Sequence, residues 1–228
     1  MPVSIRGTGG GGVTLDAGAA SADTTLTLPN TSGTILQSGT AVTPTQGGTG
    51  LTSTGAAGNV LFTTNGTAWS STPKIVLGDF ATASGTNVDY TGIPSWVKRV
   101  TIMLSFVSTT GSSIVQVQLG TSSGFETSSY FTFASFVTGT NTCGTAQYNT
   151  GIGTTFSSAG SFRSGCIVVN SIGGGGWAYS GILGDAATNS VVHIAGVKTL
   201  AGALDRLRLT TVNGTDTFDT GSINILYE

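Results

Sequence analysis

The chain has 228 residues and a formal net charge of −2, and only 8% of its residues are Asp, Glu, Lys or Arg, against about 25% in an ordinary soluble domain. The lack of a basic excess argues against nucleic acid as a partner, and no apolar run approaches the roughly 20 residues of a membrane-spanning helix, which argues against membrane insertion. The 36 glycines raise the entropic cost of folding. With so few charged residues, the surface of the folded chain must be largely uncharged. Contacts with other subunits bury such a surface more favourably than water solvates it, so we expect an obligate oligomer.

Residues 1–72 are poor in aromatic side chains and rich in Gly, Thr, Ser and Ala. Short apolar pulses interrupt this composition at 13–15, 26–29 and 34–36, and each ends near Gly, Pro or Asn. Each pulse is too short to fold alone, so we expect an extended β stalk that other chains complete. Residues 1–6 lack the apolar core of a secretory signal, which predicts synthesis in a cytoplasm without a signal peptide.

The run at 7–12 formally matches the dinucleotide-binding pattern G-x-G-x-x-G. That motif needs a strand before it and a helix after it, and neither is indicated, so a simple glycine loop is favoured. Aromatic and β-branched residues become frequent after Pro73. We therefore divide the chain into an attachment and stalk segment, 1–72, and a distal domain, 73–228.

Strict alternation of apolar and polar residues over 99–107 predicts a β-strand. Its apolar residues fall on one face, namely Val100, Ile102, Leu104 and Phe106. A second alternating run, 114–119, follows a link rich in Ser, Thr and Gly. Two such runs joined in this way predict a β-hairpin.

Runs of the same kind predict about nine short strands, at 75–77, 99–107, 114–119, 130–136, 166–170, 177–182, 191–195, 204–211 and 222–227. Short strands separated by turn signals are typical of a sandwich or a jelly roll. We predict an all-β fold, in which an antiparallel, jelly-roll-like β-sandwich follows an extended Gly/Thr/Ser-rich β stalk.

Two further expectations concern the turns and the core of this domain. Asn213 and Gly214 both tolerate positive φ and give the strongest signal for a tight hairpin turn. Aromatic side chains are expected to fill the core, namely Phe125, Tyr130, Phe131, Phe133 and Phe136. The last strand is expected to line one face with Ile223, Ile225 and Tyr227.

Catalysis needs acids, bases or nucleophiles that converge, and the chain offers few. The one histidine, His193, lies in an alternating run, where a hydrogen-bonded strand residue is more common than a base, and Glu126 and Glu228 are the only glutamates. The oxygens of 213–219 lack the spacing of a calcium loop, so a polar turn is favoured. We predict that the chain is not an enzyme and holds no cofactor and no metal.

Cys143 and Cys166 are too few for a disulfide framework. One bridge between them is an open alternative. Two buried free thiols are the favoured interpretation.

Several short sequence segments resemble known proteins. Three of them are similar to the low-complexity repeats of tailed-bacteriophage tail fibres and related receptor-binding virion proteins, namely QGGTGL (46–51), GNVLF (58–62) and NGTAW (65–69). Two stretches, 92–100 and 204–228, are similar to the distal domain of some phage fibre proteins.

This resemblance implies a homotrimer whose N-terminal segment docks on other virion proteins of the tail or baseplate. Its distal domain would mediate host-receptor recognition by binding a bacterial surface glycan or protein. The N-terminal part is short for a fibre, so a short spike, a head fibre or a baseplate appendage stays open. The alternatives are a purely structural virion component, such as a decoration or adaptor subunit without host binding, and a polysaccharide-cleaving tail spike.

A receptor-binding role would place the contact in loops at the tip of the distal domain, because loops vary while a scaffold holds them. The longest candidate segments are 138–163 and 170–177, the second with a four-glycine run expected to be mobile. Tyr148, Trp177 and Tyr179 offer aromatic faces on which a sugar could stack. The favoured alternative for Trp177 is that it fills the core or a trimer axis.

Overall fold

The computed structural model describes residues 3–6, 9, 12–15, 48–49, 51, 59–63, 69–73 and 75–228. The chain divides into two compact units, Met1–Thr54 with Thr63–Ser70, and Gly55–Phe62 with Ser71–Glu228. The glycine run at 7–12, the apolar pulses at 26–29 and 34–36 and the stalk as a whole lie largely outside the described residues. The stalk and the boundary between residues 72 and 73 therefore stay predictions.

Two short strand pairs are described in the N-terminal third. Strand β1 (Val3–Arg6) pairs antiparallel with β2 (Gly12–Leu15), so the pulse at 13–15 finds a partner within its own chain. Strands β3 (Asn59–Phe62) and β4 (Ser70–Pro73) form a second two-stranded sheet. The side-chain amide of Asn59 donates to the Ser71 carbonyl across this pair, at 3.2 Å.

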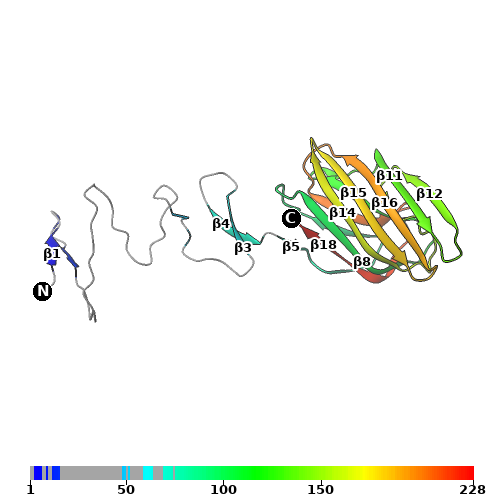
Figure 1. Ribbon diagram of the computed structural model, residues 1–228, viewed down its shortest axis with the longest axis horizontal. Helices are drawn as coiled ribbons and strands as arrows, with labels where there is room; N and C mark the ends of the chain where they lie inside the picture. The colour runs from blue at the N-terminus through cyan, green and yellow to red at the C-terminus, as the bar shows by residue number, and fades with distance from the viewer. Residues whose placement is uncertain are drawn as a thin grey trace. The chain divides into compact units, whose positions relative to one another are not determined.

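The remaining strands form two larger sheets (Figure 1), and every strand pairing described in them is antiparallel. The nine-stranded sheet runs in the order β12 (Cys143–Tyr148), β11 (Tyr130–Val137), β16 (Ser190–Thr199), β15 (Gly176–Asp185), β14 (Arg163–Gly173), β8 (Arg99–Thr109), β18 (Phe218–Tyr227) and β5 (Val76–Leu77), with β6 (Ala81–Thr82) also on β18. The five-stranded sheet runs β10 (Gly124–Phe125), β9 (Val115–Thr121), β17 (Arg206–Thr211) and β7 (Asn87–Thr91), with β13 (Ile152–Gly153) also on β9.

No residue in the described part of the chain is helical, and the all-β prediction is confirmed. Each of the nine predicted strands overlaps an observed strand. The prediction missed five short strands between residues 75 and 228, at 81–82, 87–91, 124–125, 143–148 and 152–153. All of these except 87–91 carry too little alternating apolar sequence to be noticed.

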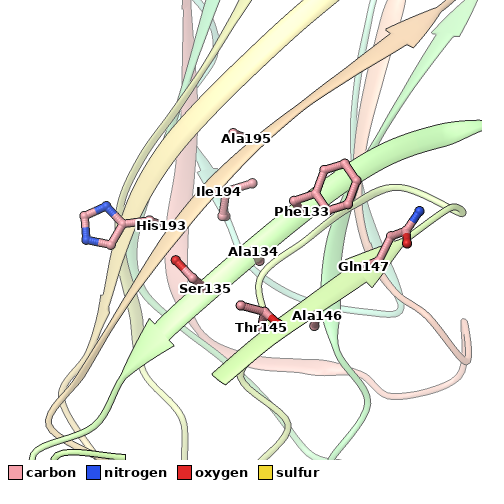
Figure 2. Close-up of a pocket in the computed structure, with 9 residues that line it drawn as sticks. All are labelled: Phe133, Ala134, Ser135, Thr145, Ala146, Gln147, His193, Ile194 and Ala195. Atoms are coloured by element: carbon pink, nitrogen blue, oxygen red, sulfur yellow. The ribbon is translucent and has the colours of Figure 1, made fainter. Parts of the chain in front are cut away.

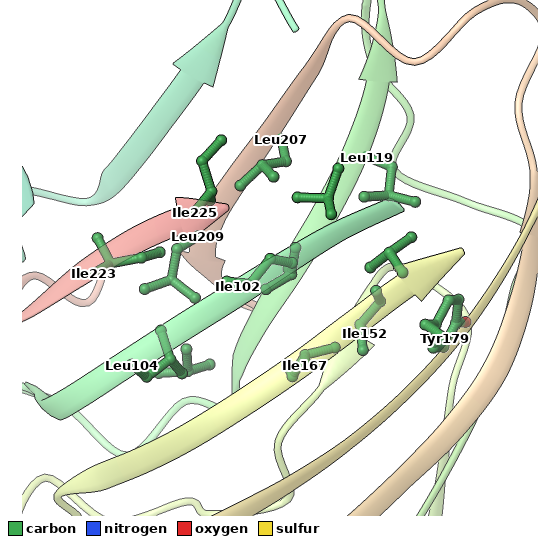
Figure 3. Close-up of a cluster of buried hydrophobic side chains, with 14 of the residues drawn as sticks. Ile102, Leu104, Leu119, Ile152, Ile167, Tyr179, Leu207, Leu209, Ile223 and Ile225 are labelled. Carbon is green, nitrogen blue, oxygen red and sulfur yellow. The ribbon is translucent and has the colours of Figure 1, made fainter. Parts of the chain in front are cut away.

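The two sheets share one buried hydrophobic cluster, which makes the packing sandwich-like (Figure 3). Alternation explains the arrangement, because every second side chain of a strand points to the same face. The nine-stranded sheet contributes Ile102, Leu104, Ile167, Ile223 and Ile225, and the five-stranded sheet contributes Leu119, Ile152, Leu207 and Leu209. Each such side chain stabilises the fold by about 1.5–3 kcal/mol through burial.

The predicted hairpin between 99–107 and 114–119 is wrong. Strand β8 pairs with β14 and β18 in the large sheet, whereas β9 pairs with β17, β10 and β13 in the small sheet. The link at 110–114 therefore crosses between the sheets. Similarly, the turn at Asn213 and Gly214 exists, with φ +69° at Gly214, but it connects β17 and β18, which belong to different sheets.

The placement of Phe106 on the buried face of its strand is also wrong. A bulge interrupts the pairing of β8 with β18, so Phe106 leaves the parity of Leu104 and is 58% exposed. Its φ is +50°, and the neighbouring Gly221 has φ +94°. Backbone crowding explains the glycine, because a Cβ at Gly221 would clash with the Phe106 carbonyl.

The expected aromatic core is only partly correct. Tyr130 is buried, and Phe136 is packed partly buried against the cluster. In contrast, Phe131 and Phe133 alternate with Tyr130 along β11 and point to the opposite, exposed side. Both thus lie on the surface of the nine-stranded sheet.

Candidate functional site

The strand registers define two ends of the two-sheet unit. The near end is where β5 begins, because Val76 pairs with Tyr227 and the Arg99 and Glu228 backbones are hydrogen-bonded beside it. The opposite end of the strands is the far end. Its connections, here called the far-end loops, are residues 83–86, 110–114, 138–142, 154–162, 186–189 and 212–217.

Hydrogen bonds join two of the far-end loops, 110–114 and 212–217, into one surface. The Ser113 amide donates to the Asp216 carboxylate at 2.8 Å, and the Thr110 amide donates to the Thr217 carbonyl at 2.8 Å. Asn213 donates its side-chain amide to the same carboxylate at 2.7 Å. The bonds from Asn213 and Ser113 lower the pKa of Asp216. These contacts fit the predicted polar turn.

A buried carboxylate joins two further far-end loops, 154–162 and 186–189. Asp185 accepts hydrogen bonds from the Phe162 amide at 2.8 Å, the Ala187 amide at 3.1 Å and the Thr188 hydroxyl at 2.7 Å. Burial by itself would raise the pKa of Asp185, but these hydrogen bonds outweigh it and lower the pKa. The ionised carboxylate therefore fixes the chain on both sides of it.

A buried guanidinium holds loop 154–162 from beneath. Arg163 is 0% exposed, and its Nη2 donates to the Phe156 carbonyl at 2.9 Å while Nη1 donates to the Ser161 carbonyl at 3.2 Å. Desolvation lowers the pKa of Arg163 to about 10, although Asp185 and Asp219 oppose this shift. Arg163 acts as a positioning residue, because its side chain binds the loop backbone from inside.

The surface formed by the far-end loops is almost free of charge. Within these loops Asp216 is the only Asp, Glu, Lys or Arg. Their exposed polar side chains are hydroxyls and amides, including those of Ser112, Thr140, Asn141, Ser157, Ser158, Thr188, Asn189, Asn213 and Thr215. Such groups both donate and accept hydrogen bonds without carrying charge, as do the hydroxyls of a sugar.

The near end has the opposite character. Three of the ion pairs seen in the described part of the chain lie there, and they are Arg99–Glu228 at 3.0 Å, Lys198–Glu126 at 2.6 Å and Arg206–Asp205 at 2.8 Å. Lys198 is buried and also donates to the Ser128 carbonyl at 3.0 Å. Charge is thus concentrated at the end of the unit where β5 begins.

Two of the three residues proposed for sugar stacking are buried. Trp177 is 5% exposed and Tyr179 is 3% exposed, and both belong to the hydrophobic cluster. The Tyr179 hydroxyl lies 2.7 Å from the Thr132 hydroxyl, and burial raises the pKa of Tyr179 to about 12. Trp177 therefore fills the core, as the favoured alternative expects, and neither ring offers a stacking face within this chain.

The third residue, Tyr148, is half-buried at the near-end limit of β12, where it pairs with Thr132. Its ring packs on Gly153, where a Cβ would clash with it. None of the three aromatic residues lies in the far-end loops. The aromatic side chain exposed there is Phe162, at 37%. Its place inside the candidate segment 138–163 is the only signal for it in the sequence.

The two candidate recognition segments lie at opposite ends. Segment 138–163 supplies two far-end loops, whereas the glycine run of segment 170–177 forms the near-end turn between β14 and β15. Gly174 and Gly175, with φ of +57° and +79°, form a two-residue turn of the type I′ kind, and Gly173 pairs with Gly176. The run expected to be mobile is therefore a hydrogen-bonded hairpin.

The other candidate reactive residues do not converge. Cys143 and Cys166 are free thiols, but both are exposed rather than buried, because they lie on outward-facing positions of edge strand β12 and of β14. His193 is exposed on β16. The described residues hold no group of three or more His, Cys, Asp or Glu that could bind a metal ion, and they include no helix long and apolar enough to cross a membrane.

Comparisons of the chain with protein-family models, with curated proteins and with solved structures find no match.

Proposed function

We propose that the chain is a subunit of a bacteriophage virion appendage, a trimeric tail fibre that recognises the host receptor through its far-end loops. The observation that carries this proposal is the uncharged surface of hydroxyl and amide groups at the far end, mounted on two rigid sheets. Loops on such a scaffold vary in sequence without refolding the core. The resemblance of several sequence segments to phage fibre proteins supports the same function.

In this proposal residues 1–72 form an extended β stalk that docks on other virion proteins, and the two-sheet unit is a jelly-roll-like sandwich that faces the host. The order of the chain supports this orientation, because β5, the first strand of the two larger sheets, begins at the near end. The receptor is a bacterial surface glycan or protein, and the protein resides in the virion. A purely structural virion component is the second candidate. The large uncharged face of the nine-stranded sheet favours it, because such a face suits contacts between subunits whether or not the protein binds a host.

Binding of the full-length protein to an array of bacterial surface polysaccharides and to bacterial cells tests the proposal. Phe162→Ala should weaken binding at least tenfold, because a stacking aromatic contributes about 1.5 kcal/mol or more at a binding hot spot. Ile172→Ala, an exposed apolar residue of the β14–β15 hairpin, is the matched control and should bind like the parent.

Melting transitions of both variants should equal that of the parent, which shows that the change is local. Binding of Phe162→Ala at parental strength would remove Phe162 from the site. A folded parent that binds no polysaccharide and no cells would favour the purely structural virion component.

A further inference from the structure

The outer face of the nine-stranded sheet, meaning the side turned away from the core, is uncharged over most of its width. Cross-strand pairing aligns its side chains in rows. One row consists of Thr145, Ser135, His193, Ile182, Cys166 and Met103, and the next of Gln147, Phe133, Ala195, Ser180, Val168 and Thr101. Neither row contains Asp, Glu, Lys or Arg.

Large apolar side chains stand on this face. Phe131, Phe133 and Ile182 are each more than half exposed, and Val137 and Val191 are more than two-fifths exposed. Figure 2 shows Phe133, Gln147 and His193 around the small side chains of a shallow pocket of about 510 Å³ on β12, β11 and β16. The face therefore carries both protruding apolar side chains and a shallow pocket.

Phe106 lies beside this face, because its backbone amide donates to the hydroxyl of Ser164 at 2.9 Å and Ser164 shares the outward parity of Cys166 on β14. It holds this position at a cost in backbone energy. Its left-handed φ of +50° is unfavourable for a bulky residue, by about 1–3 kcal/mol. Its ring is nevertheless 58% exposed and gains nothing from the core. A glycine would fit the bulge better, and packing within the buried cluster does not account for the phenylalanine.

The outer face of the five-stranded sheet differs. Arg208 donates two hydrogen bonds to Asp89, both at 2.7 Å, and its guanidinium stacks at 4.1 Å over the ring of Phe125. Gln118 donates to the Thr150 carbonyl at 3.0 Å. All of these polar groups have hydrogen-bond partners within the chain, and the Arg208–Asp89 ion pair puts charge on this face, so it is already suited to water.

We propose that the outer face of the nine-stranded sheet is buried against a second copy of this chain. A second copy is the favoured occupant because the uncharged faces of neighbouring copies, turned toward one threefold axis, meet without like-charge repulsion and without stripping water from ions. Exposed aromatic and aliphatic groups supply several hundred Å² of apolar area. That is the order of the roughly 800 Å² that each partner of a stable interface removes from water.

This inference rests on the homotrimer in the proposed function and assigns the surface that forms it. Light scattering on the full-length protein should give three times the chain mass of 22.7 kDa. Phe133→Lys and Ile182→Lys should each reduce the mass to that of one chain, because each places an ammonium group inside the interface. Val212→Lys, which changes a similarly exposed residue in a far-end loop, is the control and should keep the parental mass.

Phe106→Gly is the second variant. This change relieves the left-handed strain and removes an interface ring. The variant should melt at a temperature no lower than that of the dissociated Lys variants. Its subunits should associate at least tenfold more weakly than those of the parent. Because this change favours the bulge, loss of assembly here is not a folding defect.

The thiol of Cys166, central on the face, reports burial directly. In the Cys143→Ser protein, iodoacetamide should label Cys166 at least tenfold more slowly than in the same protein carrying Phe133→Lys. Equal labelling rates, or Lys variants with the parental mass, would overturn the assignment of this surface while leaving a trimer intact. A parent that is a single chain in solution would remove both the trimer and the interface, whereas receptor binding is decided separately by the binding of the full-length parent to polysaccharides and cells.

Discussion

At the scale of single residues, one buried cation sets the shape of the far end. Arg163 has no carboxylate in direct ion-pair contact among the residues described, and its hydrogen bonds go to backbone carbonyls of Phe156, Ser161 and Val107. Burying a charge in this way is costly unless the hydrogen bonds are made. The sequence pattern around it, a lone Arg between Phe162 and Ser164, gives no sign of this role.

Replacing Arg163 should therefore loosen a loop rather than merely weaken the core. Arg163→Met fills a similar volume but leaves the Phe156 and Ser161 carbonyls without donors, which should cost about 2–3 kcal/mol of unfolding free energy. Urea unfolding measures the loss, and limited proteolysis should show new cleavage within 154–162. Cleavage confined to other segments would show that Arg163 does not hold this loop.

At the scale of elements, turn chemistry explains why the glycine run is ordered. The β14–β15 turn needs two successive residues of positive φ, which Gly174 and Gly175 supply. Space is not the constraint at Gly174, since a Cβ there would meet no atom within 4 Å. Backbone conformation alone decides which residues this position accepts.

This distinction yields a paired prediction. Gly174→Val should destabilise the protein by about 1–2 kcal/mol, because a β-branched residue is strained at positive φ. Gly174→Asn should cost clearly less, since asparagine tolerates the left-handed region. Thermal melting of the two variants side by side provides the comparison, and equal losses would mean that the turn has another conformation.

At the scale of the whole molecule, one core couples the two sheets. Leu209 is fully buried on the small sheet, within the cluster that includes Ile102 and Ile225 of the large one. Leu209→Ala should lower the unfolding free energy by about 2–5 kcal/mol. Because the cluster is shared, hydrogen exchange should accelerate in β15 as well as in β17. Acceleration limited to β17 would show that the sheets unfold separately.

The sequence by itself determined the all-β class and the places of the main strands, because alternation of period two is a local property of the chain. It could not determine strand partners, since the same alternation suits any sheet. The runs at 99–107 and 114–119 are neighbours in sequence, yet each is buried by strands far along the chain.

Only the tertiary structure decided which face of a strand is buried. Strand β11 offers Phe131 and Phe133 on one side and Tyr130 and Thr132 on the other, and hydrophobicity alone favours burial of the phenylalanines. Thr132 is buried instead because its hydroxyl lies 2.8 Å from the Gly151 carbonyl and 2.7 Å from the Tyr179 hydroxyl. Those partners come from residues 19 and 47 positions away, and a buried polar group is stable only once they are in place.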